Sequence, residues 1–205
     1  MILSAIRTEV RTRCGLNSAD ANFTDAILLT LINAALRQIS TVEDWPWMQV
    51  STTAVTVAGT ETITLAANCR KVNQMQYEYR DLRYVQFRDR HLYYGLTGYP
   101  ALFSEFAGSY YIWPKPDAVY TIDYTYYRLT EPTLAADGDS PLIPDWAIDL
   151  LISKVCSLVA RRNRDKDLES VFYAEHRQIL QDIRDDVMRV TQGKTPKRVG
   201  YGRSF

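Results

Sequence analysis

Residues 43–57, EDWPWMQVSTTAVTV, contain the change of pattern on which the fold of this chain depends. Upstream, between residues 28 and 42, apolar side chains recur at steps of three and four, which is typical of one face of a helix. Pro46 prevents that helix from continuing, because its nitrogen carries no hydrogen to donate. Downstream, Thr and Val dominate, and Val55 and Val57 alternate with polar neighbours, which favours a strand.

Residues 1–47 are therefore predicted to be the N-terminal helices of a bundle. Leu3, Ile6 and Val10 share one face of a first helix, and Gly15 follows it as a stop signal. Thr24 has the hydroxyl side chain that is favoured at the N-cap of the second helix.

The second helix ends in the bulky sequence Trp45-Pro46-Trp47. Two large rings on either side of a proline can fill the gap between layers of secondary structure. We therefore expect these three residues to form the structural junction between the helices and the region that follows.

Residues 48–140 are predicted to form an inserted antiparallel β domain, sandwich-like or barrel-like. Gly59 offers a turn, with alternating residues on both sides of it, so a hairpin is expected there. Met75, Tyr77 and Tyr79 form another period-two set. Further strands are expected near 82–87, 101–106, 110–113 and 119–128, with a loop or short helix near His91 and a turn at Pro114-Lys115-Pro116-Asp117.

Residues 141–192 return to helical periodicity, and residues 193–205 form a basic C-terminal tail. Pro144 stands where a helix would begin, and residues 145–163 are apolar almost all round, which indicates a buried helix. A longer helix follows with a narrow apolar stripe. Helices, then strands, then helices indicate the α+β class, with the terminal helices joined in one bundle.

Composition excludes several classes of protein. Lys and Arg together equal Asp and Glu at 24 each, so no strong net field draws the chain to nucleic acid or a membrane. Three cysteines, an odd number, argue against a disulfide framework and suit a reducing compartment. No apolar signal core and no run of eighteen apolar residues are present, so we expect a chain made in a cytoplasm, with no membrane partner.

Residues suited to catalysis are few. His91 and His176 are the two histidines, and both are interpreted as structural or surface residues. Gly193-Lys194-Thr195 lacks the earlier glycine of a phosphate-binding loop, and Asp137-Gly138-Asp139-Ser140 lacks the closing Glu of a calcium loop. We therefore predict no enzyme, no catalytic residues, no cofactor and no metal site.

Two groups of residues indicate association with other molecules. One is a basic and aromatic run, which we interpret as a subunit interface or channel surface; its members are Arg80, Arg83, Arg88, Arg90, Tyr93 and Tyr94. Such a run could also grip single-stranded nucleic acid, although Asp81 and Asp89 dilute its charge. The other is the tail, an arm that orders on binding a partner; its candidate contacts are Lys194, Lys197, Arg198, Tyr201, Arg203 and Phe205.

Several stretches, in order and spacing, resemble the head-to-tail adaptor (connector, head-completion) family of tailed bacteriophages. They are Leu31 to Ile39 (LINAALRQI), Asp44 to Trp47 (DWPW), Gly98-Tyr99-Pro100, Ile112 to Pro116 (IWPKP), Tyr124 to Tyr127 (YTYY), Ile143-Pro144 and Ala160-Arg161-Arg162. The resemblance covers about residues 25 to 190.

The resemblance implies a virion protein, assembled in the host cytoplasm. Copies would form a ring, twelve-fold, beneath the portal protein, with the tail segment 194–205 reaching the portal. The ring would extend the channel for passing double-stranded DNA, without sequence specificity, and present its far side to a tail or nozzle protein. The alternatives are a tail-tube or tail-completion protein, or a nucleic-acid-binding module that uses the Arg–Tyr run.

Overall fold

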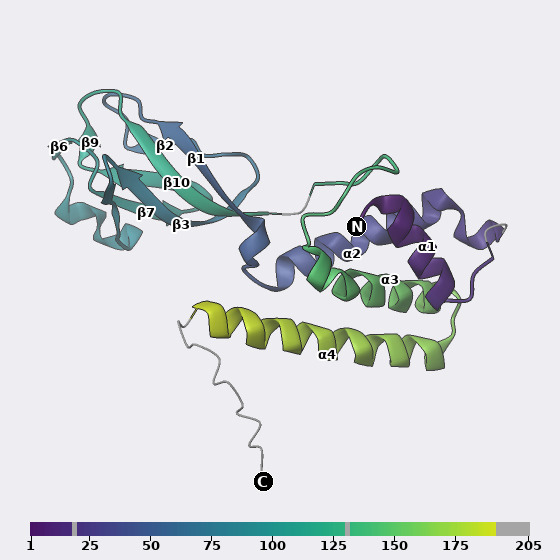
Figure 1. The fold of residues 1–205 in the computed structure, drawn as a ribbon. Coiled ribbons are helices and arrows are strands. Elements are labelled where there is room, and N and C mark those ends of the chain that lie inside the picture. The colour runs from purple at the N-terminus through teal and green to yellow at the C-terminus, as the bar shows by residue number, and fades with distance from the viewer. Residues whose placement is uncertain (18–19, 130–131, 192–205) are drawn as a thin grey trace, which may run out of the picture. The chain divides into compact units, whose positions relative to one another are not determined.

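The computed structural model describes residues 1–17, 20–129 and 132–191, and these have the α+β architecture that the sequence predicts (Figure 1). The chain forms two compact units. A helical unit contains Met1–Ile39 and the chain from Pro132 onward, and a β unit contains Ser40–Glu131.

The helical unit contains four α-helices and two short 3₁₀ turns among the described residues. They are α1 (Leu3–Arg13), η1 (Ala21–Phe23), α2 (Asp25–Val42, whose last residues belong to the β unit), η4 (Asp145–Ala147), α3 (Ile148–Arg162) and α4 (Lys166–Thr191). The predicted helices are confirmed, and the Thr24 hydroxyl accepts a hydrogen bond from the Ile27 N–H at 3.4 Å. Gly15 follows α1 with a φ of 62°, a conformation that glycine adopts without strain.

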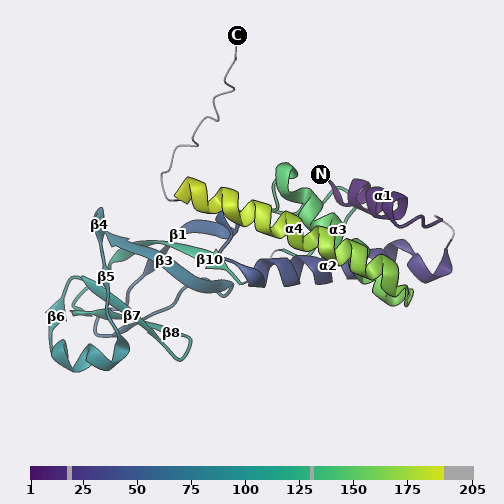
Figure 2. The ribbon, with the colours of Figure 1, turned by 90° about the horizontal axis from the view of Figure 1, so that it is seen from below.

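Helix α3 is the most buried helix of this unit, because it packs against both α4 and α1 (Figure 1 and Figure 2). Its fully buried residues include Leu150, Leu151 and Val155. Trp146, which the apolar pattern places with them, lies in η4 before the helix and is 63% exposed. The helix predicted from residue 145 therefore begins with a 3₁₀ turn that exposes its tryptophan, whereas the first turn of α3 buries Ile148, Leu150 and Leu151.

The segment between Pro132 and Pro144 is held to the helices by specific polar contacts. The Asn33 amide donates to the Leu134 carbonyl and accepts from the Leu134 N–H, both at 3.0 Å. The Leu3 N–H donates to the Asp139 carbonyl at 2.8 Å, and Arg7 forms an ion pair with Asp137. An irregular segment is therefore fixed without strands of its own.

Over its described residues, the β unit contains two four-stranded sheets and a short two-stranded one. The first has the order β1 (Gln49–Val55), β10 (Thr121–Arg128), β3 (Cys69–Tyr77) and β4 (Arg80–Asp81), all antiparallel. The second has the order β2 (Thr62–Ile63), β8 (Ser109–Trp113), β7 (Leu102–Phe106) and β5 (Arg83–Tyr84), with β5 parallel to β7. The third pairs β6 (Thr97–Gly98) with β9 (Lys115–Pro116) in parallel, and the 3₁₀ turns are η2 (Pro46–Met48) and η3 (Phe87–Leu92).

The core of the β unit comes from both four-stranded sheets. Strand β10 contributes Ile122, Tyr124 and Tyr126 from alternate positions, while Met75 comes from β3 and Ile112 from β8. Strand β4 is followed by buried Leu82 and then by β5, so the chain passes from one sheet to the other at this corner. The unit is thus closed on the β4–β5 side.

The prediction of a hairpin at Gly59 is wrong. Strand β1 pairs with β10 and strand β2 pairs with β8, in different sheets. The Thr56 N–H still donates to the Tyr120 carbonyl at 2.9 Å, and the Gly59 N–H then donates to the Pro116 carbonyl at 2.7 Å. These bonds direct the segment toward β9. The turn at Gly59 therefore connects strands of two different sheets and does not join β1 and β2 as a hairpin.

Tyr79 also differs from its prediction as a strand residue. Strand β3 ends at Tyr77, and Glu78 and Tyr79 have φ values of 48° and 64°, which form a tight turn into β4. The Tyr79 side chain is consequently 98% exposed at the tip of this turn.

Candidate interaction surface

Short helix η3 is anchored to the second four-stranded sheet by a stack of aromatic rings. Phe87 lies parallel to Phe106, with ring centroids 4.2 Å apart, and 4.6 Å from the ring of Tyr111. Tyr93, just after η3, stacks at 6.4 Å on the buried Trp113. Offset and edge contacts of this kind stabilise packing beyond the area they bury.

Two of the predicted arginines contact this aromatic stack, and a third, Arg88, lies in η3 itself. The Arg90 guanidinium lies 4.5 Å above the Phe87 ring, and Arg83 donates to the Tyr93 hydroxyl at 3.5 Å. Arg88 is 79% exposed, and its nearest carboxylate, Asp89, is 3.7 Å away. We call Arg83, Arg88, Arg90 and Tyr93 the η3 patch.

The remaining two residues of the predicted run differ in position. Tyr94 directly follows the η3 patch and is 82% exposed. Arg80 lies in β4, in the first sheet, and lines a separate hollow. The structure thus brings five of the six residues together and separates the sixth, because the chain changes sheets between Arg80 and Arg83.

The η3 patch suits recognition of anions. Guanidinium groups bind carboxylates and phosphates through paired N–H donors, and a stacked guanidinium is held ready to do so. Exposed aromatic rings beside it supply rigid contact area with a polar tip. The same chemistry fits an acidic protein surface or a nucleic-acid backbone.

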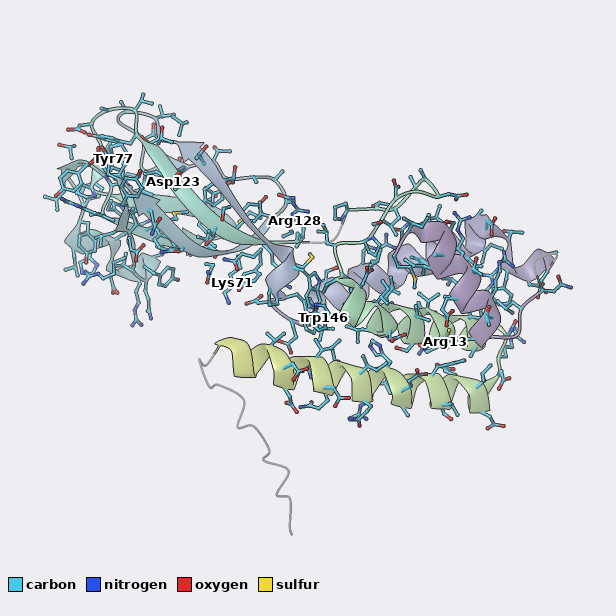
Figure 3. The ribbon with its side chains drawn as sticks, in the orientation of Figure 1. Arg13, Lys71, Tyr77, Asp123, Arg128 and Trp146 are labelled. Carbon is cyan, nitrogen blue, oxygen red and sulfur yellow. The ribbon has the colours of Figure 1, made fainter. Side chains whose placement is uncertain are left out.

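A hollow of about 440 Å³, lined by tyrosines, was not predicted from the sequence. Tyr77 (Figure 3) and Tyr120 meet edge to face there at 5.1 Å, and Tyr99 completes the aromatic lining. The Tyr120 hydroxyl donates to Asp117, and this hydrogen bond raises the pKa of Tyr120 to about 12. The period-two pattern of the sequence grouped Tyr77 with Tyr79, and this grouping is wrong because the positive-φ turn separates the two residues.

At the predicted structural junction, Trp45 is buried and Trp47 stacks on it at 4.7 Å, while Pro46 begins η2. Beside them Asp44 pairs with Arg70 and, at 2.7 Å, with Lys71 (Figure 3). The hydrogen bond from Lys71 is the main cause that lowers the pKa of Asp44. The end of α2 is thereby tied to β3 within the β unit.

The two histidines lie in different units. His176 of α4 is buried, and its Nδ1 lies 3.1 Å from the Leu150 carbonyl and 3.5 Å from the Ser153 hydroxyl. Burial is the first cause that lowers the pKa of His176, with Lys154 adding to it. His91 is exposed in η3, with Nδ1 3.1 Å from the Arg88 carbonyl.

In the described part of the chain, no group of three or more His, Cys, Asp or Glu residues is placed to hold a metal ion. Within the same residues, no helix is long and apolar enough to cross a membrane. The six candidate residues of the tail, Lys194, Lys197, Arg198, Tyr201, Arg203 and Phe205, lie outside the described residues.

Comparison with known proteins identifies a family. No curated protein sequence matches the chain. The model of the SU10 adaptor protein family matches residues 1–200, which is nearly the whole sequence. The chain therefore belongs to the SU10 adaptor protein family and is a structural adaptor of a phage.

Proposed function

We propose that this chain is the head-to-tail adaptor subunit, and that copies of it form a twelve-fold ring beneath the portal. The observation that carries this proposal is the family match over residues 1–200. In the proposed ring the inner wall extends the channel for double-stranded DNA, and the far side receives the tail or nozzle protein. The virion is the site of action, and assembly takes place in the host cytoplasm.

Two features of the described residues support an assembly role. Several aromatic side chains of the β unit are exposed, among them Tyr79, Tyr84, Tyr94 and Tyr99. The η3 patch adds exposed cationic groups beside them. Aromatic residues and arginine are enriched in protein interfaces, and a ring requires one side of a subunit to fit a different side of the next.

The decisive experiment is electron microscopy of the purified chain, alone and mixed with its portal. We expect isolated subunits to be monomeric or weakly associated, and a closed twelve-fold ring to appear on the portal. Stable closed rings or long tubes without the portal would contradict the adaptor role, and tubes would favour a tail-tube protein.

The tail is proposed as the portal-binding arm. It contains four basic residues and no acidic residue, and Tyr201 and Phe205 serve as its anchors in this proposal. Deletion of residues 194–205 should leave the melting temperature of the subunit nearly unchanged and weaken its binding to the portal. Equal binding by the truncated and full chains would show that the arm is not used.

A further inference from the structure

The outer face of the first four-stranded sheet contains a polar hollow of about 390 Å³, which we call the Asp123 hollow (Figure 3). Asp123 of β10 lies between Thr53 of β1 and Gln76 of β3 in the register of the sheet. Gln76 lies in turn opposite Asp81 of β4, so a single cross-strand row contains two carboxylates. The hydroxyl and amide side chains that complete the lining on this face are Ser51, Thr125 and Gln74.

The Asp123 hollow carries negative charge that the described residues do not neutralise. The side-chain amides of Gln76 and Gln74 donate to Asp81 at 2.8 and 2.7 Å, and these hydrogen bonds lower the pKa of Asp81. Asp123 is exposed, and within the part of the chain that the structure describes it has no hydrogen bond and no ion pair. Arg80, the neighbour of Asp81 in β4, points to the opposite side of the strand. A cationic group from outside the subunit would therefore meet carboxylates without a competing cation.

Thr125 adds a hydrogen-bonding group to the same hollow. It lies between Ser51 and Gln74 in the register, in the row next to that of Asp123. Its Oγ1 is buried and has no hydrogen-bond partner among the described residues. Buried hydroxyl groups are normally hydrogen-bonded, so we expect a polar group from another molecule to reach this side chain.

Strand alternation places the η3 patch on the opposite side of the β unit. Ile122 of β10 points into the core between the two sheets, so Asp123 points outward from the first sheet. Ile112 of β8 points into the same core, so Tyr111 points outward from the second sheet. Phe87 of η3 contacts that outward ring, with centroids 4.6 Å apart. The Asp123 hollow and the η3 patch therefore lie on opposite faces of the β unit (Figure 2).

We propose that the η3 patch of one copy docks on the Asp123 hollow of the next copy in the ring, with Arg88 entering the hollow and pairing with Asp123. This step rests on the proposed function, because a ring needs a contact between two different faces of the subunit. Arg88 is suited to the contact, since its side chain is 79% exposed and its Nε lies 3.7 Å from Asp89. Its two terminal nitrogens are left for paired hydrogen bonds to a carboxylate.

Charge favours a copy of this chain over nucleic acid as the occupant of the hollow. Phosphates would be repelled by Asp81 and Asp123, whereas a guanidinium is attracted to them. The η3 patch presents Arg83, Arg88 and Arg90, the sign of charge that the hollow lacks. Repeated around a ring, this one contact matches the cationic face of every subunit with the acidic face of its neighbour.

Exchange of the two charges tests the contact. In Arg88→Glu or Asp123→Arg subunits, like charges meet at every contact, and the concentration needed to form rings on the portal should rise about ten-fold or more. The double variant restores opposite charges and should return to within about three-fold of the wild type. Arg177→Glu, at an exposed arginine of α4, changes the net charge as Arg88→Glu does and should assemble like the wild type. Electron microscopy counts the rings, and melting temperatures confirm that each variant is folded.

Variants that only remove charge give a second readout if Asp123→Arg does not fold. Arg88→Gln and Asp123→Asn should each raise the concentration needed for ring formation by roughly the same factor, about three-fold or more. If the two groups pair, the double variant should be no weaker than either single variant. Losses that add would show that the two residues act at separate places, and would overturn the proposal.

The charge exchange has its own contrary results. Normal ring formation by both reversed variants, failure of the double variant to recover, or an equal loss in Arg177→Glu would each overturn the proposal. Normal rings that fail to retain DNA in Arg88→Glu particles would place the η3 patch in the channel instead. If the wild-type chain forms no ring on the portal, the proposed function itself fails, a result distinct from normal rings in the reversed variants.

Discussion

The helical unit and the β unit use their charged residues differently. In the helical unit, arginines connect segments far apart in the sequence: Arg7 pairs with Asp137, and Arg13 (Figure 3) reaches Asp149 at 2.7 Å and Glu175 at 3.2 Å. In the β unit, Arg83 and Arg90 contact aromatic residues, and Arg88 contacts only its neighbour Asp89 among the carboxylates that the structure describes.

Aromatic residues give the same contrast. Tyr79 and Tyr94, the most exposed tyrosines among the described residues, both lie in the β unit, and the η3 patch lies there as well. The helical unit is held by ion pairs between distant segments, whereas the β unit, besides the ion pairs of Asp44 with Arg70 and Lys71, leaves aromatic and charged side chains exposed. We therefore expect the partner contacts of the described residues to lie mainly in the β unit.

The largest loss of stability is expected at Trp45, and Trp146, a tryptophan with the opposite exposure, is its control. Trp45 of the β unit is buried and stacks on Trp47, so Trp45→Ala should cost about 3–5 kcal/mol through lost contacts and a cavity. Trp146 of the helical unit (Figure 3) is largely exposed, and Trp146→Ala should cost about 0.5 kcal/mol. Denaturant unfolding of both variants measures these costs, and equal losses would contradict the observed burial.

The next largest loss of stability is expected when the hydrogen bonds between α2 and the irregular segment 132–144 are removed. Asn33→Ala leaves the buried Leu134 N–H and carbonyl without their partner, which should cost roughly 2–3 kcal/mol. Asn22, an exposed asparagine of η1, is the matched control, and Asn22→Ala should change the free energy of unfolding by less than about 0.5 kcal/mol. A similar small loss for Asn33→Ala would mean that the 132–144 segment is not fixed by this pair.

A smaller effect with a pH signature is expected at His176. Its pKa is lowered in the folded chain, so the unfolded chain binds more protons at acidic pH. The stability contribution is fully present above the unfolded pKa of about 6.5 and declines as the pH falls below it. Thermal melts between pH 5 and 8 should show this decline, and His176→Gln should remove it while costing about 1 kcal/mol at pH 8.

The exposed His91 is the control for the loss of an imidazole. His91→Gln should change the free energy of unfolding at pH 8 by less than about 0.5 kcal/mol, because the ring lies on the surface of η3. Persistence of the acid decline in His176→Gln would assign the acid sensitivity to other groups.

The helices could be predicted from the sequence because their signals are local. The apolar steps of α1, the Thr24 cap and the stop at Gly15 all lie within the segment they describe. Strand partners are a different matter, since period-two alternation tells which face is buried and not which strand lies alongside. Strand β1 pairs with β10, far along the chain, and the nearby Gly59 turn therefore suggested the wrong neighbour.

The candidate surface was predictable in composition and not in arrangement. The run of arginines and tyrosines was visible, but the change of sheet at Leu82 separates Arg80 from Arg83. The tyrosine-lined hollow combines Tyr77, Tyr99 and Tyr120 from three distant segments, and nothing in their spacing brings them together. Long-range pairing of strands decides both outcomes.

The smallest stability effects are expected for two arginines, Arg13 of the helical unit and Arg88 of the β unit, on which the comparison of the two units depends. Arg13→Ala removes a guanidinium with three carboxylate partners and should cost about 1 kcal/mol, a modest value because these groups are partly exposed to solvent. Arg88→Ala should change the free energy of unfolding by less than about 0.5 kcal/mol, since its side chain is largely exposed and its one described carboxylate contact is long.

The order of the two effects should reverse in assembly. Arg88→Ala should weaken ring formation on the portal, measured by sedimentation at low and at high salt, with the larger difference from wild type at low salt. Arg13→Ala subunits that remain folded should assemble normally. If Arg13→Ala impairs assembly while Arg88→Ala does not, the contacts between copies lie in the helical unit, and the assignment of partner surfaces to the β unit is wrong.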